Sequence, residues 1–167
     1  MRKVLVIGPG GSGKSTFARQ LAARTGLPLI HLDTLYWSAG WVPAPNDVWD
    51  RTVAELIAGD AWVMDGNYGR TLSVRLAACD TVFFLDLPPL VCLWRVWRRS
   101  REHRGRSRPD LADGCPERLT WEFVWWILTY RRRRRPGIIS QLSALADHQR
   151  AIVLRSSAAV RRYLDAL

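Results

Sequence analysis

The sequence predicts a single α/β domain whose parallel β-sheet is covered by helices on both faces. Five short apolar runs are separated by stretches long enough for helices, at residues 3–7, 27–33, 61–67, 81–88 and 151–156. A glycine-rich loop, GPGGSGKST, joins the first run to a helical pattern. Alternating strands and helices are typical of parallel sheets. Because 167 residues suffice for one hydrophobic core, we expect one domain over 1–167.

In the first half of the chain, helical spacing of apolar residues begins at Phe17, directly after the glycine loop. Residues 46–57 show the same spacing, and Asn46 or Asp47 can cap that helix. Between the two patterns, residues 34–45 mix proline, glycine and aromatic residues without a period. We expect this stretch to be a loop.

In the second half, further helices are expected at residues 89–104, 119–135, 138–149 and 157–167. Pro136 and Gly137 should stop the second of these helices, since proline cannot continue a helix. Residues 104–118 are basic, rich in turn residues and aperiodic, which predicts a loop between two helices.

Composition narrows the classes of function. The net charge is +10, and nearly all of it is arginine, because lysine stands only at positions 3 and 14. Such a charge predicts anionic partners, either nucleotide or nucleic acid. Three isolated cysteines disfavour disulfides and a zinc site. No apolar run approaches the ~18 residues of a membrane span and no signal peptide is evident, so a cytoplasmic protein is expected.

The glycine loop fits two templates. Gly8, Gly10 and Gly13 satisfy the dinucleotide-binding pattern GxGxxG, and Asp33 follows at the expected separation. The same loop satisfies GxxxxGK[ST], the P-loop pattern. A triphosphate with Mg²⁺ needs a lysine followed by hydroxyls, whereas a dinucleotide turn does not. We therefore expect a P-loop that binds ATP through Gly8, Gly10, Gly11, Ser12, Gly13, Lys14, Ser15 and Thr16.

Further motifs carry a family resemblance. HLDTLYW, DGNYGRT, LWR, GRSRPD and GCPER together resemble the adenylate-kinase-like family labelled DNA topology modulation protein (FlaR). The resemblance extends over nearly the whole chain. It implies a P-loop fold of the nucleoside-monophosphate-kinase type, with a five-stranded parallel sheet in the order 2-3-1-4-5, a lid, and binding of ATP with Mg²⁺.

Three carboxylates end predicted strands, where parallel sheets bind their ligands. By resemblance to the Asp-Gly motif, Asp65 is expected beside Ser15 on the metal, with Asp86 as a competitor for that role. Asp33 can orient a substrate hydroxyl or accept its proton, or else cap the segment that follows it.

The acceptor is expected against residues 34–62. By resemblance, Arg70 faces the acceptor, and Asn67 in the longer turn before it is assigned to substrate binding. Nucleotide kinases place an arginine where this chain has Thr-Leu-Tyr-Trp, which weakens the case for AMP. Trp37 and the neighbouring tryptophans predict an aromatic acceptor pocket, although core packing is the alternative for each.

The lid is expected over about residues 100–135. Arg95 and Arg99 lie one helical turn apart, and in the resembling kinases such a pair contacts adenine and phosphates. Arg106 and Arg108 would close on the γ-phosphate. From the run Arg131–Arg135, Arg132 or Arg135 can reach the nucleotide, and the other arginines oppose the helix dipole or contact nucleic acid or anionic membrane.

Lys14, Asp33, Arg99, Arg106 and Arg108 are thus the expected catalytic residues. The leading hypothesis is an ATP-dependent phosphotransferase acting on a small molecule. The acceptor could be a nucleoside monophosphate, a nucleoside, a shikimate-like hydroxy acid or an antibiotic. A nucleotide-binding modulator of DNA topology and an ATP-binding protein without turnover are the alternatives, and the oligomeric state stays open.

Overall fold

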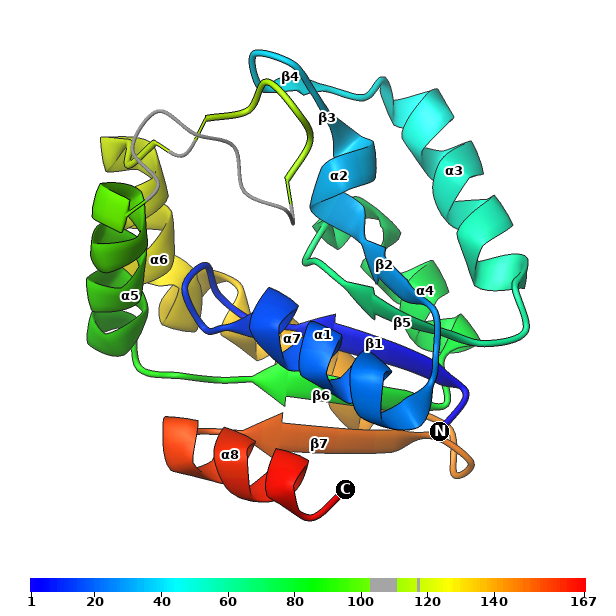
Figure 1. Cartoon of the computed structure of the whole chain (residues 1–167). Coiled ribbons are helices and arrows are strands. Elements are labelled where there is room, and N and C mark those ends of the chain that lie inside the picture. The colour runs from blue at the N-terminus through cyan, green and yellow to red at the C-terminus, as the bar shows by residue number, and fades with distance from the viewer. Residues whose placement is uncertain (103–110, 117) are drawn as a thin grey trace.

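The computed structural model describes residues 1–102, 111–116 and 118–167, and a five-stranded parallel sheet forms its centre (Figure 1). The strand order is β2-β5-β1-β6-β7, which is the predicted order 2-3-1-4-5. In the central strand, Leu5 is in register with Met64 on one side and with Val82 on the other. The strands are β1 (Lys3–Ile7), β2 (Leu29–His31), β5 (Trp62–Asp65), β6 (Thr81–Leu85) and β7 (Arg150–Leu154).

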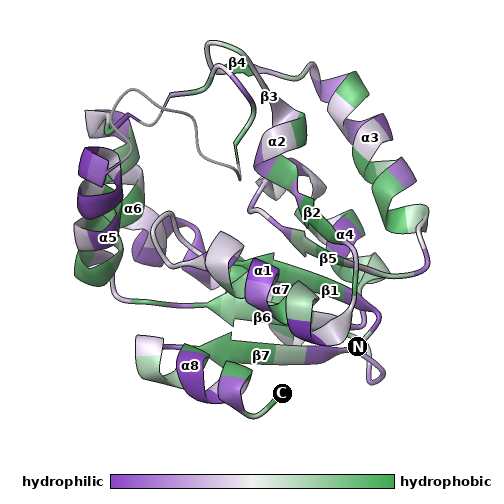
Figure 2. Ribbon diagram, viewed as in Figure 1, coloured by the Kyte–Doolittle hydropathy of each residue, from purple (hydrophilic) through white to green (hydrophobic). Residues whose placement is uncertain are grey.

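Helices cover both faces of this sheet, as predicted. Val4 and Val6 of β1 belong to one core cluster, and Leu5 and Ile7 belong to the other. Because successive strand residues point to opposite faces, apolar residues on both sides bury residues 4–7 of β1, and Figure 2 shows β1 and β6 as hydrophobic. The helices are α1 (Lys14–Thr25), α3 (Asn46–Ala58), α4 (Leu72–Ala78), α5 (Pro89–Glu102), α6 (Trp121–Arg133), α7 (Arg135–Ser143) and α8 (Ser157–Asp165).

The stretch expected as a loop at 34–45 is partly regular. It contributes to helix α2 (Leu32–Tyr36) and to a small antiparallel pair, β3 (Trp37–Ser38) with β4 (Val42–Pro43). Aromatic contacts stabilise this segment, since the ring of Tyr36 packs edge-on against Trp37 and Trp49. Local periodicity could not reveal it, because the stabilising contacts reach other elements.

Two boundaries differ from the prediction. Asp33 was expected to close the second strand, but β2 ends earlier and Asp33 lies in the first turn of α2. Pro136 and Gly137 were expected between helices, but both lie at the start of α7. Proline is tolerated in the first helical turn, where the missing N–H has no partner to lose. The helix expected at 138–149 is therefore shifted toward the N-terminus.

Candidate active site

The glycine loop between β1 and α1 passes so close to its neighbours that side chains would not fit. A Cβ on Gly8 would lie 2.6 Å from the carbonyl oxygen of Leu85, and Gly8 has a positive φ of 152°. A Cβ on Gly11 would overlap with the carbonyl oxygen of Cys92 in α5. The loop is thus fitted against the end of β6 and against α5, and glycine is required at both positions.

The interior of the loop has the properties of an anion site. The hydroxyl of Ser12 is buried and has no hydrogen-bond partner among the described residues. Helix α1 begins at Lys14 without a side-chain cap from the described residues, and first-turn amides of a helix have no intrahelical partner. A phosphate would satisfy such donors and would be favoured by the helix dipole. The residues present therefore fit a bound phosphate.

The single lysine of the loop is under the electrostatic influence of several charged side chains. Burial lowers the pKa of the Lys14 ammonium, while the carboxylates of Asp33 and Asp65 act to raise it. The guanidinium of Arg99 also lowers that pKa. Lys14 therefore lies within the electrostatic influence of Asp33, Asp65 and Arg99; that these residues act on one ligand stays a prediction.

The two competing aspartates have different partners. Asp65 ends β5 and is buried, and its Oδ1 lies 2.6 Å from Nδ1 of His31 at the end of β2. Asp86 is also buried, but its Oδ2 accepts a 2.9 Å hydrogen bond from Nε of Arg135. Asp65 influences Lys14 directly, which favours Asp65 over Asp86 on the phosphate side.

A fully buried arginine organises the loop that follows Asp65. Arg75 of α4 is 0% exposed, and its guanidinium donates to three consecutive backbone carbonyls. The distances are 3.0 Å to Gly66, 2.5 Å to Asn67 and 2.9 Å to Tyr68. Burial lowers the pKa of Arg75 to about 10. These hydrogen bonds hold the backbone of Tyr68 in the left-handed region. Its φ is 31°, a conformation that strains a residue other than glycine.

Two side chains of this loop link the halves of the site. Asn67 accepts a 3.0 Å hydrogen bond from the amide of Gly8 and donates a 2.7 Å bond to the carbonyl of Gly8. The hydroxyl of Tyr68 donates a short hydrogen bond to Asp33. Arg75 thereby supports both the phosphate loop and the carboxylate on the acceptor side. Asn67, expected to bind substrate, lies against the phosphate loop instead.

The predicted acceptor residues are divided between the site and the core. Trp49 and Trp62 are buried in the core, whereas Trp37 and Trp41 are partly exposed and pack edge-on with centroids 5.4 Å apart. Arg70, expected to face the acceptor, forms an exposed ion pair with Asp50 of α3, with Nη2 2.6 Å from Oδ2. An aromatic wall is thus present, but the expected arginine is bound elsewhere.

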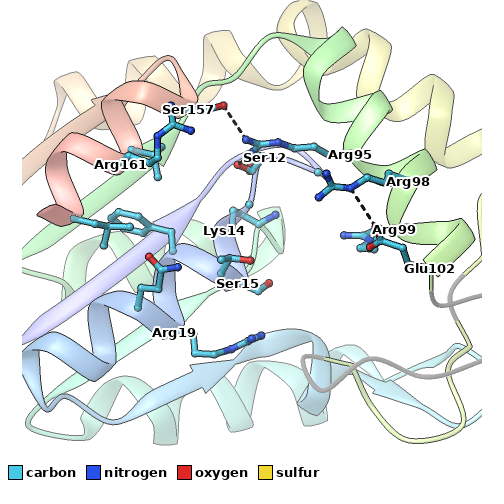
Figure 3. A pocket seen from close by; sticks show the side chains of 17 residues that line it. Ser12, Lys14, Ser15, Arg19, Arg95, Arg98, Arg99, Glu102, Ser157 and Arg161 are labelled. Carbon is cyan, nitrogen blue, oxygen red and sulfur yellow. Dashed lines mark hydrogen bonds and ion pairs between the residues drawn. The ribbon is translucent and has the colours of Figure 1, made fainter.

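A cavity of about 570 Å³ lies beside the phosphate loop, between α1, α5 and α8 (Figure 3). This volume is typical of small-molecule sites. Arg95 spans it, donating to the carbonyl of Ser12 at 3.0 Å and to the hydroxyl of Ser157 at 2.8 Å. Cations far outnumber acidic groups in its lining, where Glu102 is joined by Lys14, Arg19, Arg95, Arg98, Arg99 and Arg161.

The lid is described only in part. Arg106 and Arg108 lie outside the described residues. Residues 111–116 pack on the β3–β4 turn, where Gly40 N donates to Gly114 O at 2.9 Å and the indole of Trp41 donates to Pro116 O at 3.2 Å. In the arginine run, 131–134 are exposed and Arg135 is bound to Asp86. Neither Arg132 nor Arg135 lines the cavity.

Several residues of the site were missed by sequence reasoning. His31 could have been noticed as one of only three histidines, directly after an apolar strand. Arg75 gave no local signal, because the sequence around an arginine on a short helix does not show whether its side chain is buried or exposed. Ser157 and Arg161 of α8 were missed because nothing local places the last helix beside the glycine loop.

No family model matches the chain. A shikimate kinase of Bradyrhizobium diazoefficiens is 29% identical over a region covering 70% of this chain and 60% of that protein, so the chain spans less than two thirds of that relative. Among solved structures, a shikimate kinase from Acinetobacter baumannii in complex with shikimate has a TM-score of 0.60 at 20% identity, covering 99% of this chain and 92% of that one.

Two further solved structures are similar. A sugar kinase from a Janibacter species has a TM-score of 0.53 at 21% identity, covering 99% of this chain and 93% of its own. A shikimate kinase from Bacteroides thetaiotaomicron has a TM-score of 0.56 at 17% identity, covering 98% and 94%. This chain therefore has the P-loop α/β fold of the shikimate kinases, which confirms the predicted fold class. None of these four relatives has a name that refers to DNA topology.

Proposed function

We propose that this chain is an ATP-dependent kinase that phosphorylates a hydroxyl group of a small molecule. One observation carries the proposal: the glycine loop leaves no room for a Cβ at Gly8 or Gly11, and it places the buried Ser12 hydroxyl, which has no partner among the described residues, beside Lys14 at the start of α1. Phosphoryl transfer needs positioning and charge stabilisation at one point, which this loop and its lysine would supply. The relatives named as shikimate kinases and as a sugar kinase support the same class of reaction.

The donor would bind across the glycine loop and the cavity beside it. Backbone amides of the loop and the orphaned hydroxyl of Ser12 would contact phosphate oxygens. Lys14 would contact the β- and γ-phosphates as a compact positive charge. The base would then enter the cavity between α5 and α8, where Arg95 already bridges the two helices.

A divalent cation fits this arrangement as part of the donor. The hydroxyl of Ser15 and the carboxylate of Asp65 would hold Mg²⁺ together with phosphate oxygens. Once bound, the ion would supply charge neutralisation to the phosphates. His31 would fix the orientation of the Asp65 carboxylate through its 2.6 Å contact.

On the acceptor side, Asp33 would work as the base or the orienting group. The acceptor hydroxyl oxygen forms a bond to the γ-phosphorus while the bond from that phosphorus to the bridging oxygen breaks, and ADP leaves. The hydroxyl proton passes to Asp33 and then to water. Tyr68 holds Asp33 in place through its hydroxyl. Arg99, with Arg106 and Arg108 of the lid, would stabilise the charge on the transferred group.

The acceptor is better described as a hydroxylated small molecule than as a nucleoside monophosphate. Arg70, the arginine expected to bind an acceptor phosphate, is paired with Asp50 on the surface. The rings of Trp37 and Trp41 instead present a partly exposed aromatic wall on the segment that follows Asp33 in the chain. A ring compound with several hydroxyls, such as a shikimate-like acid or a sugar, suits a carboxylate beside aromatic rings.

The test is ADP formation from ATP-Mg²⁺ with shikimate-like acids, sugars, nucleosides, nucleoside monophosphates and aminoglycosides as acceptors. We expect turnover with one hydroxylated class and a loss of about 10²–10³-fold or more in Lys14→Ala, since a charged group that stabilises the transition state is removed. Lys3→Ala is the matched control, because Lys3 donates to Ile57 O at the opposite end of β1. A flat panel, with ATP bound and not consumed, would overturn the proposal.

The sequence also left open a nucleotide-binding modulator of DNA topology. Its support is the exposed arginine run 131–134 and the net charge. Binding through phosphates alone would be insensitive to sequence and would weaken steeply with salt. Replacing these four arginines with glutamine should abolish DNA retention without changing acceptor-dependent turnover; unchanged DNA retention would exclude that role for the run.

A further inference from the structure

Two adjacent helices expose an unusual number of large apolar side chains. On α5 these are Leu90, Trp94 and Trp97, and on α6 they are Trp121, Trp125 and Leu128. Trp121 is 77% exposed and Leu90 is 75% exposed. Soluble monomers rarely expose several such residues together, and where they do the patch tends to mark an interaction site. We call these six residues the tryptophan face.

Helical spacing places each set on one side of its helix. Leu90, Trp94 and Trp97 are separated by four and three residues, as are Trp121, Trp125 and Leu128. Residues at this spacing form a single stripe. The two helices pack against each other and run in opposite directions (Figure 1). Each stripe therefore faces outward from the same helix pair, opposite the sides that contribute Cys92, Val96 and Ile127 to the core.

Arginines accompany both stripes. The guanidinium of Arg98 lies 4.9 Å from the ring centroid of Trp94, and that of Arg101 lies 4.8 Å from Trp97. On α6, Arg132 follows Leu128 by one turn and is exposed. Apolar rings and cations are thus interleaved on this surface, and Arg98 and Arg101 each lie over the face of an indole.

We propose that the tryptophan face binds the surface of an anionic phospholipid membrane. Indoles favour the boundary between headgroups and hydrocarbon, where their apolar rings are buried and the N–H stays hydrated. Leu90 and Leu128 would enter the same layer, and the arginines would contact lipid phosphates. No helix among the described residues is long and apolar enough to span a membrane, so this attachment would be peripheral.

Other occupants match the surface less well. A single-stranded nucleic acid could stack on the indoles, but it would leave Leu90 and Leu128 without a partner. In addition, Arg98 and Arg101 already cover one face of Trp94 and Trp97. A second copy of the chain would bring arginines against arginines, which costs association free energy. An anionic lipid surface accommodates all three groups: its phosphates pair with the arginines, and the boundary between headgroups and hydrocarbon takes up the indoles and the leucines.

The test is flotation of the full chain with vesicles of phosphatidylcholine alone or of phosphatidylcholine containing phosphatidylglycerol. We expect flotation with the anionic vesicles and a loss of about tenfold or more in Trp94→Ser/Trp125→Ser, because membrane binding scales with buried apolar area. Arg101→Gln should weaken binding to anionic vesicles and make the remaining binding less sensitive to salt. Val48→Ser/Val74→Ser is the matched control, since these exposed valines lie on α3 and α4.

Each other outcome would overturn the proposal. Undiminished flotation of the double tryptophan variant, with its thermal unfolding unchanged, would show that another surface binds lipid. Retention of single-stranded DNA or RNA in place of vesicles, lost in the same variant, would identify the face as a nucleic-acid platform. A dimer in light scattering that this variant converts to monomer would assign the face to a second copy. The proposal does not depend on kinase activity.

Discussion

The two sides of the glycine loop are built in opposite ways. On the donor side, a cavity of about 570 Å³ is lined by cations from three helices. On the acceptor side, the hydroxyl of Tyr68 already binds Asp33, and on the phosphate side His31 already binds Asp65. The cavity therefore offers its cations to a large anion, whereas both carboxylates are held by the protein's own side chains before any ligand binds.

This difference suggests a division of labour within the proposed reaction. Affinity for the nucleotide would come from the cationic side chains that line the cavity, and the loss of one of these charges should weaken nucleotide binding. Catalytic orientation would come from hydrogen bonds among the protein's own groups, and the loss of one of these should slow turnover. Arg75 supports both sides through the loop 66–71, so it should affect both quantities.

Replacing Arg75 should have the largest effect. Arg75→Met removes the donors for three backbone carbonyls and leaves their partners inside the fold, and we expect the free energy of unfolding to fall by about 2–3 kcal/mol. Turnover should fall as well, because Asn67 and Tyr68 lose their support. Urea unfolding and ADP formation measure the two effects. Arg24→Met, an exposed arginine in the last turn of α1, is the control, and equal midpoints for the two variants would refute the role of Arg75.

Removing the hydroxyl of Tyr68 should slow turnover without weakening ATP binding. Tyr68→Phe keeps the ring packing on Tyr36 and Trp49 but removes the hydrogen bond from the Tyr68 hydroxyl to Asp33. We expect kcat to fall by roughly 10–100-fold, part of what a positioned base contributes, with KM for ATP unchanged. In an Asp33→Asn background the same change should cost nothing further. Additive losses in the double variant would show that Tyr68 does not act through Asp33.

Arg95 probes the donor side. Arg95→Ala removes a cation from the cavity together with its bonds to Ser12 and Ser157. We expect KM for ATP to rise by about tenfold, since a charge-assisted hydrogen bond to phosphate or base is lost, while kcat changes little. Steady-state kinetics with varied ATP measure this. Arg101→Ala on the same helix should leave KM unchanged, and a fall in kcat alone for Arg95→Ala would contradict the division of labour.

The exposed pair Asp50 and Arg70 should matter least. Arg70 lowers the pKa of the Asp50 carboxyl, so any stability from the pair is present above the ordinary aspartate pKa and is lost as pH falls through the lowered one. Both groups are solvated, so this contribution should be too small to resolve. Thermal unfolding of Asp50→Asn between acidic and neutral pH should follow the wild type. A clear loss at neutral pH only would give the pair a structural role.

Much of the fold could be predicted from the sequence. The glycine loop has a fixed spacing set by phosphate geometry, and buried parallel strands are continuous apolar runs, so β1, β5, β6 and β7 were found within a few residues. Asp33 and Asp65 were expected beside the glycine loop because predicted strands end there, whereas Arg99 was assigned through the family resemblance. The structure places all three within the electrostatic influence of Lys14, and their roles stay predictions.

The remainder depends on contacts between distant segments. Arg70 was assigned to the acceptor from its place in a motif, but its partner Asp50 stands 20 residues away on another helix. Arg75 is buried only because three carbonyls of a strained loop turn toward it. The contribution of α8 to the cavity depends on how the last helix packs. Neither short motifs nor the spacing of apolar residues can predict contacts between segments that are distant in the sequence.

The glycine loop also lies against aromatic rings. A Cβ on Gly10 would lie 2.6 Å from the ring of Phe123, and Phe123 stacks on Trp126 with an interplanar angle of 12°. The indole of Trp126 itself comes within 3.3 Å of the same Cβ position, so it borders the loop expected to hold the phosphates. Its emission responds to charge and polarity, so Trp126 gives the protein an intrinsic optical reporter of donor occupancy. The difference spectrum between the wild type and Trp126→Phe isolates that signal from the other eight of the nine tryptophans.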